Sequence, residues 1–275
     1  MRFALNYSPQ AAALLAEGRI EIDLYKCPDW VDLVADAQKQ RPAYIHFPIV
    51  AGRNTIADLN LDAIEGWLTR TDTYHVNAHF SPRVTTLPAG IDRDGVVEHG
   101  VREMEILTRR FGPERVILEN VPYTHCEISR QILLAGVDPT VIHDVILGAG
   151  CGLLLDVSHA VLTCENTGQD YETYLKALPT HLLRELHITG IGVHPEKQVR
   201  EDHLALQDED WARVEQVIGH IARGEWAQPG IVSMEYGGIG PTFEWRSEPD
   251  VIATQCRACM RCAIRSSRAP NGELK

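Results

Sequence analysis

The chain of 275 residues lacks any apolar run that approaches the ~20 residues of a membrane span. Met1 is followed at once by a strand-like stretch, without the apolar segment of a secretory signal, so we expect no signal peptide. Cysteine is scarce and odd in number, with seven residues scattered mostly at apolar positions. This usage is typical of a reducing compartment, so we expect a cytoplasmic protein that does not bind membranes.

Basic residues are also few. The chain has 26 Lys and Arg against 38 Asp and Glu, which gives a formal net charge of −12. Because an acidic surface repels phosphate backbones, this balance disfavours general nucleic-acid binding. No linker or low-complexity tract divides the chain, and its 44% hydrophobic content is enough for a large core.

Eight short apolar runs of strand length alternate with amphipathic stretches of helical period. The predicted strands are 2–6, 20–26, 43–47, 75–80, 116–119, 152–157, 183–188 and 231–235. The predicted helices are 9–17, 30–38, 61–70, 95–110, 127–147, 170–178, 208–223 and 249–264. Strict alternation favours parallel strands with right-handed crossovers, and eight units favour closure into a single (β/α)₈ TIM barrel. We expect that barrel over residues 1–265, with a frayed tail over 266–275.

Acidic and imidazole side chains stand at the ends of the later strands, where barrels carry their chemistry. The strand ends are His46, His79, Glu119, Asp156, His187 and Glu235, and His159 follows Asp156 by three residues. The loop after the seventh strand adds Glu201-Asp202-His203. In an extended segment Glu201 and His203 would share one face, but Asp202 is a competing carboxylate and the sequence leaves that choice open.

Each of these residues has an ordinary structural explanation. A strand-end histidine often makes only a structural hydrogen bond, and Glu119 could cap a helix or pair with an arginine. Together, however, so many carboxylates and imidazoles at one barrel mouth would repel one another without cations. The set predicts two or three divalent metal ions, and its nitrogen and oxygen donors suit iron, manganese or zinc.

The same residues resemble the ligand series of the xylose-isomerase-like TIM-barrel superfamily. That superfamily includes sugar isomerases and epimerases and the trinuclear zinc enzyme endonuclease IV. The series here is His79, Glu119, Asp156-x-x-His159, His187, Glu201-x-His203 and Glu235.

The sequence around these residues resembles more closely that of a third branch, the multinuclear non-haem iron oxidases of peptide-natural-product biosynthesis (the methanobactin type). The similar segments are Leu118-Glu119-Asn120-Val121, Leu154-Leu155-Asp156-Val157, Glu185-Leu186-His187-Ile188-Thr189-Gly190 and the early Ile45-His46. This resemblance implies iron as the favoured metal and a small or peptide substrate, with a thiol that a ferric ion could hold. It also implies a possible partner protein that presents the peptide.

Two positions depart from the oxidase pattern. Ser158-His159 stands where the oxidases usually have Asn-Asn, and a histidine there resembles the endonuclease and isomerase pattern instead. Glu201 stands where the oxidases tend to have aspartate.

Other residues are candidates for substrate contact. Gly237 and Gly238 follow the last strand, where barrels often bind phosphate through backbone N–H groups, although a flexible turn explains them equally well. Asn120, His194 and Lys197 are further candidates at the barrel mouth. The spacing Cys256-x-x-Cys259-x-x-Cys262 fits either helix packing or a redox-sensitive patch.

We therefore predict a metal-dependent enzyme and favour a non-haem iron oxidase. The alternative is a metal-dependent sugar or sugar-phosphate isomerase or epimerase, in which Glu119 or Glu235 would shuttle a proton. An endonuclease IV-like phosphodiesterase is the hydrolytic version, and the net charge of −12 counts against it.

Overall fold

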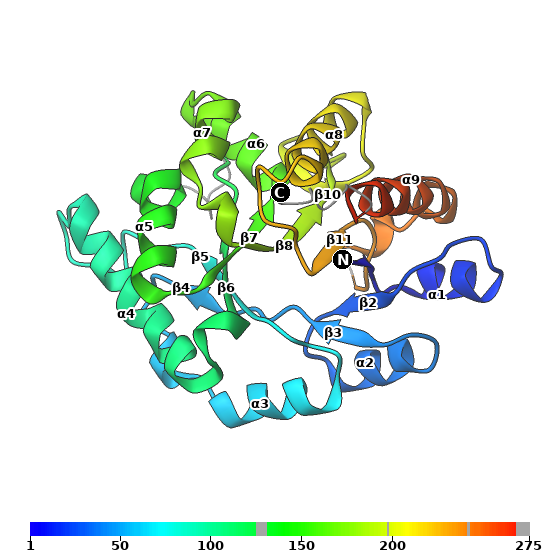
Figure 1. Ribbon diagram of the computed structural model, residues 1–275, viewed down its shortest axis with the longest axis horizontal. Helices are drawn as coiled ribbons and strands as arrows, with labels where there is room; N and C mark the ends of the chain where they lie inside the picture. Colours follow the sequence, from blue (N-terminus) through cyan, green and yellow to red (C-terminus); the bar gives the residue numbers. More distant parts are fainter. Residues whose placement is uncertain (125–130, 197, 241–242, 268–275) are drawn as a thin grey trace, which may run out of the picture.

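The computed structural model describes residues 1–124, 131–196, 198–240 and 243–267, with side chains as far as residue 260. Nine strands of this part form one parallel sheet that curls around a central axis, with helices on its outside (Figure 1). In sheet order they are β3 (Ala43–Ile45), β2 (Leu24–Cys27), β1 (Arg2–Asn6), β11 (Ile231–Met234), β8 (Leu183–Ile188), β7 (Gly152–Asp156), β6 (Val116–Asn120), β5 (Val76–Phe80) and β4 (Val50–Ala51).

The short strands β3 and β4 are the two ends of one barrel strand. β3 pairs with β2 on one side, and β4 pairs with β5 on the other. Between them, the His46 N–H donates to the Cys27 carbonyl at 2.9 Å. The Ile49 carbonyl accepts from the His79 N–H at 2.9 Å. Residues 43–51 thus link the two edges of the sheet, and eight strand positions surround the axis, which confirms the predicted α/β TIM barrel.

Helices fill most of the crossovers, at bounds close to the predicted ones. The described helices are α1 (Pro9–Ala16), α2 (Val31–Gln38), α3 (Leu61–Arg70), α4 (Arg93–Phe111), α5 (Pro139–Ala149), α6 (Val157–Thr167), α7 (Tyr171–Ala177), α8 (Asp208–Ala222) and α9 (Pro249–Ser267). The predicted tail over 266–275 lies almost wholly outside the described residues.

The predicted helix over 127–147 is wrong in its first half. Residues 125–130 lie outside the described part, and 134–137 form a 3₁₀ turn. α5 begins at Pro139 because the Asp138 side chain caps it, accepting from the Thr140 N–H at 2.8 Å. Proline has no N–H to donate into an earlier turn, so it suits the first helical position.

Two features of the structure were not predicted. α6 starts directly after β7 with no loop, and the antiparallel hairpin β9 (Gly190–Val193) and β10 (Arg200–Leu204) follows β8. Both lie at the carboxyl ends of barrel strands, so they help to shape the barrel mouth.

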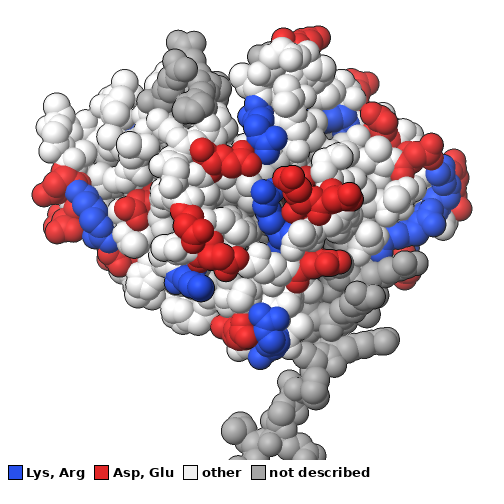
Figure 2. Space-filling model, turned by 90° about the horizontal axis from the view of Figure 1, so that it is seen from above, with Lys and Arg blue, Asp and Glu red and all other residues white. Residues whose placement is uncertain are grey.

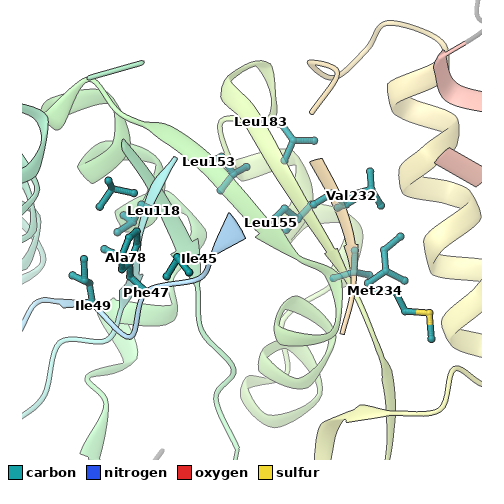
Figure 3. Packing of buried hydrophobic residues seen from close by; sticks show 14 of the residues in the cluster. Ile45, Phe47, Ile49, Ala78, Leu118, Leu153, Leu155, Leu183, Val232 and Met234 are labelled. Atoms are coloured by element: carbon teal, nitrogen blue, oxygen red, sulfur yellow. The ribbon is translucent and has the colours of Figure 1, made fainter. Parts of the chain in front are cut away.

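Alternation along the strands separates the outer core from the barrel interior. Leu153 and Leu155 of β7 belong to the large apolar cluster beneath the helices, together with residues from neighbouring strands (Figure 3). A separate small cluster fills the interior near the amino ends of the strands, and its members are Ala4, Leu24, Tyr44 and Ile231. Further along the same strands, the same face carries Asn6, Lys26, His46 and Glu235. The interior therefore changes from apolar to polar towards the mouth.

The outer surface mixes charges of both signs. On the face shown in Figure 2, acidic and basic side chains lie interspersed. Several form exposed pairs, such as Arg19 with Asp250 at 2.8 Å. Among the described residues, no helix is both long and apolar enough to span a membrane.

Candidate metal centre

Three histidines at the barrel mouth share one ring orientation. Each has Nδ1 at hydrogen-bond distance from a backbone carbonyl oxygen, which can only accept, so Nδ1 carries the proton. The pairs are His79 with Ile49 at 3.0 Å, His159 with Asn120 at 2.7 Å and His203 with Glu235 at 3.1 Å. In the neutral form of each ring, Nε2 therefore carries the lone pair, which is the usual preparation of a metal-binding histidine.

Glu119 presents its two oxygens to different histidines. Its Oε2 lies 3.2 Å from His79 Nε2 and 3.4 Å from His46 Nε2, and these two nitrogens are 3.1 Å apart. Its Oε1 lies 3.4 Å from His159 Nδ1. Glu119 is buried, and its Oε2 has no hydrogen-bond partner. We refer to His46, His79 and Glu119 as the Glu119 group; their donor atoms are close enough to share one ion.

A second set of donors, His159, Asp202 and His203, forms the Asp202 group. Asp202 Oδ2 lies 2.8 Å from His159 Nε2 and 3.9 Å from His203 Nε2. Asp156 borders this group, with Oδ2 at 3.6 Å from His159 Nε2. His159 Nε2 and the carboxylate oxygens face one another here, so either a proton on Nε2 or a shared metal cation holds them together.

Asp156 uses only one oxygen for the fold. Its Oδ1 caps α6, accepting from the His159 N–H at 3.0 Å and from the Ser158 hydroxyl at 2.6 Å. Its Oδ2 is buried with no hydrogen-bond partner. A buried carboxylate oxygen left in this way is costly unless a cation binds it.

The electrostatics of the site prepare it for cations. Burial lowers the pKa of His46 well below its ordinary value, and Lys26 and neighbouring histidines lower it further, so this ring is neutral and able to bind metal. Burial also lowers the pKa of His159, but Asp156, Asp202 and Glu119 outweigh it and raise that pKa to about 10. At His159 a proton therefore replaces the missing positive charge when no metal is bound.

On the open choice between Glu201 and Asp202, the structure groups Asp202 with His203. The pairing of β10 with β9 shifts register between Glu201 and Leu204, and His203 has a positive φ of 59°. This break in alternation places Asp202 beside His203 in the Asp202 group. Glu201 Oε1 instead lies 3.2 Å from Nη1 of Arg246.

Of the substrate-contact candidates, Asn120 and His194 make hydrogen bonds within the fold. The Asn120 side chain accepts from the Asp156 N–H at 2.9 Å and donates to the Asp156 carbonyl at 3.0 Å, so it holds the end of β7. His194 packs on the Trp245 ring, and its Nδ1 accepts from the Glu196 N–H at 3.1 Å. Lys197 lies outside the described residues.

Gly237 and Gly238 line the cavity, as expected. However, the Gly238 N–H donates to the Ser247 hydroxyl at 3.0 Å, so this group is not available to a phosphate. Of the three cysteines on α9, Cys256 and Cys259 are buried in the main core, which favours packing, and the side chain of Cys262 is not described.

Two site residues were missed in the sequence. Glu185 of β8 is buried and accepts from His187 Nε2 and from the Tyr44 hydroxyl, each at 2.9 Å. Lys26 of β2 is buried and forms an ion pair with Glu235. The available signal was a charged residue within a strand-length apolar run, two residues before His187 in one case and at the end of the second strand in the other.

The donors open into a cavity of about 270 Å³. One wall carries donor atoms of both groups, and the remaining wall is largely apolar. The apolar lining includes Tyr7, Trp30, Leu33, Ile239 and Phe243. Trp30 is 53% exposed and stands at the opening. Orphaned carboxylate oxygens and oriented imidazoles fit divalent metal ions with nitrogen and oxygen ligands.

Comparison with known proteins agrees with this geometry. A model of the family described as RiPP precursor modification enzyme MbnB/TglH/ChrH matches residues 66–228. A UPF0276 protein of Paraburkholderia phytofirmans is 30% identical over 136 residues, which are 48% of this chain and 39% of that protein. A UPF0276 protein of Caulobacter vibrioides is 46% identical over 46 residues, 17% of this chain and 16% of that protein. The chain thus aligns with less than half the length of either relative.

Solved structures share the fold. D-psicose 3-epimerase from Clostridium cellulolyticum has a TM-score of 0.57 at 10% identity, over 96% of this chain and 98% of that chain. Endonuclease IV from Thermus thermophilus has a TM-score of 0.52 at 12% identity, over 96% and 99%. Identities this low show similarity of fold only. The resemblance stated from the sequence is confirmed at the level of the family, and the solved structures show the shared fold.

Proposed function

Because the chain belongs to the family of RiPP precursor modification enzymes MbnB/TglH/ChrH, we propose that it is a multinuclear non-haem iron oxidase that modifies a peptide. The family match and the shared fold support the coarser statement, a metal-dependent enzyme on a TIM barrel. The substrate we propose is a small or peptide molecule that carries a thiol. A peptide could be presented by a partner protein.

The observation that carries the proposal is the double role of Glu119. Its Oε2 faces His46 and His79, and Glu119 also groups with Asp156, which borders the Asp202 group. A carboxylate in this position can bridge neighbouring ions. A single structural ion would need no such bridge.

Some residues of the chain would bind the metal ions, and others would exclude water from the site. The Glu119 group and the Asp202 group would hold the ions, and Asp156 would add its free oxygen to the second. Bound iron would supply redox chemistry with O₂ and a position for a thiolate. The apolar cavity wall, with Trp30 at its opening, would exclude water and take the apolar part of the substrate.

The runner-up is a metal-dependent isomerase or epimerase. Glu119 and Glu235 both line the cavity, at 3.8 Å and 3.0 Å from His187 Nδ1, so two carboxylates are available for proton transfer. A phosphodiesterase of the endonuclease IV kind is less well supported, because the chain is acidic and the Gly238 N–H is already bonded.

The decisive experiment is metal identification after anaerobic purification. We expect iron by elemental analysis, with Mössbauer or EPR signals of coupled ions. Zinc or manganese would contradict the oxidase and support the isomerase or hydrolase. The variant His79→Ala should lose metal. The control His143→Ala changes a histidine on α5 that pairs with Asp144 and should keep the full content. Equal metal in both variants would show that the Glu119 group is not a site.

A further inference from the structure

Lys26 is a buried cation at the end of β2, inside the barrel. It is 7% exposed, although lysine is seldom buried without a partner. Its Nζ forms an ion pair with Glu235 Oε1. The same Nζ lies 3.5 Å from His187 Nδ1 and 3.4 Å from His187 Nε2.

Two of the atoms near Lys26, His187 Nδ1 and Glu235 Oε1, are spaced as two ligands of one metal ion could be. His187 Nδ1 lies 3.0 Å from Glu235 Oε1, a spacing that two ligands of one ion can have, since each bond to the ion is about 2.0–2.2 Å. The other nitrogen, Nε2, faces Glu185 Oε1 at 2.9 Å, the usual partner of the unmetallated side of the ring. Since Nζ is almost equally far from both ring nitrogens, it lies against the His187 ring and not on the Nδ1 lone pair. Beside Glu235 Oε1 it fills space that an ion bound to this carboxylate would need.

Among the described residues, no lysine or arginine forms a direct ion pair with the carboxylate of Glu119 or Asp202, although Lys26 and Arg246 interact with them over a longer range. The Nε2 atoms of His79 and His159 each face a carboxylate oxygen directly. Arg246, the nearby arginine, bonds to the Glu201 side chain and to the backbone oxygen of Asp202. A fixed ammonium thus stands beside Glu235 and His187, whereas the two groups depend on metal or, at His159, on a proton for their positive charge.

We propose that the Lys26 ammonium occupies a third cation position between Glu235 and His187, so that metal ions bind only at the Glu119 group and the Asp202 group. This inference rests on the proposed metal site and sets its stoichiometry. Lys26 also fixes Glu235 and His187 in place without metal. Because Lys26 lines the cavity, its ammonium group also stands on the cavity wall beside the ions, where it can donate hydrogen bonds.

The test is metal stoichiometry. Wild type, Lys26→Met and Lys26→Arg are loaded anaerobically with Fe²⁺, and separately with Zn²⁺, then desalted and measured by elemental analysis. We expect about two ions per chain in wild type and in Lys26→Arg, which keeps the charge. Lys26→Met removes the charge at similar length and should gain about one ion. Anomalous diffraction should place the added ion between Glu235 and His187.

Three ions in the wild type overturn the proposal, and so does a Lys26→Met content equal to that of the wild type. If circular dichroism shows that Lys26→Met does not fold, Lys26→Gln takes its place. The number of ions in the wild type is informative without either variant, because a third ion there contradicts the proposal. Failure of the metal site itself looks different, because wild type would then hold no ion and His79→Ala would match it.

Discussion

Asp156 divides its two oxygens between the fold and the candidate site. Oδ1 begins α6, and Oδ2 stays without a hydrogen-bond partner at the barrel mouth. The sequence identified this residue because a charge at the end of an apolar strand is unusual. It did not identify Lys26 or Glu185, because their importance comes from partners on other strands, Glu235 and His187.

Substitutions can separate the two roles of Asp156, helix capping and metal binding. Asp156→Asn keeps a side chain that caps helices well, so metal-free stability should change by less than about 1 kcal/mol. The lost charge should nevertheless reduce the metal content by about one ion. Asp156→Ala should lose the ion and also about 1 kcal/mol of stability. Elemental analysis and urea unfolding of the metal-free protein measure the two effects.

Asp170→Asn is the matched control, because Asp170 caps α7 in the same way and is exposed. It should retain all of the metal. A full metal content in Asp156→Asn would show that Oδ2 is not a ligand.

At the scale of elements, the mouth is built by segments that start or bend abruptly. α6 follows β7 without a loop, which brings His159 back over the end of the strand. The bulge in β10 brings Asp202 and His203 to one group although they are adjacent in sequence. Simple alternation would put Glu201 on one face with His203, but the sequence left Asp202 open, since a bulge depends on pairing that the sequence does not display.

Glu103 on α4 orders the segment after β4. Its buried carboxylate accepts from the backbone N–H groups of Gly52, Arg53, Thr55 and Ile56. Glu103→Gln replaces one acceptor with a donor, so it should lower the free energy of unfolding by about 1–3 kcal/mol. Urea unfolding measures this.

Glu98→Gln on the same helix is the control, since Glu98 is exposed and its ion pair with Arg102 is long, at 3.9 Å. It should change stability by no more than about 0.5 kcal/mol. If both variants are equally stable, Glu103 does not hold this segment.

At the scale of the molecule, donors from distant parts of the chain meet at one mouth. His46 lies beyond β3, His79 on β5, Glu119 on β6 and His203 on β10. A metal bound only by the folded barrel stabilises it by mass action, by about 4 kcal/mol at a free concentration ~1,000 times the dissociation constant. Removing metal with a chelator should therefore lower the unfolding temperature, measured by calorimetry before and after adding metal back.

His79→Ala should respond much less to the added metal. Identical unfolding temperatures for chelated and reloaded wild type would contradict a site that joins these strands.

The amino-acid sequence alone determined the barrel and most of the candidate donors. Period-2 and period-3.6 patterns are local, and barrel topology sends every strand end to one mouth, so His79, Glu119 and Asp156 could be grouped without coordinates. Only the tertiary structure grouped Asp202 with His203, showed Asn120 bound to the strand backbone, and brought Lys26 against Glu235. These outcomes depend on bulges, ring orientations and contacts between strands that are far apart in the sequence.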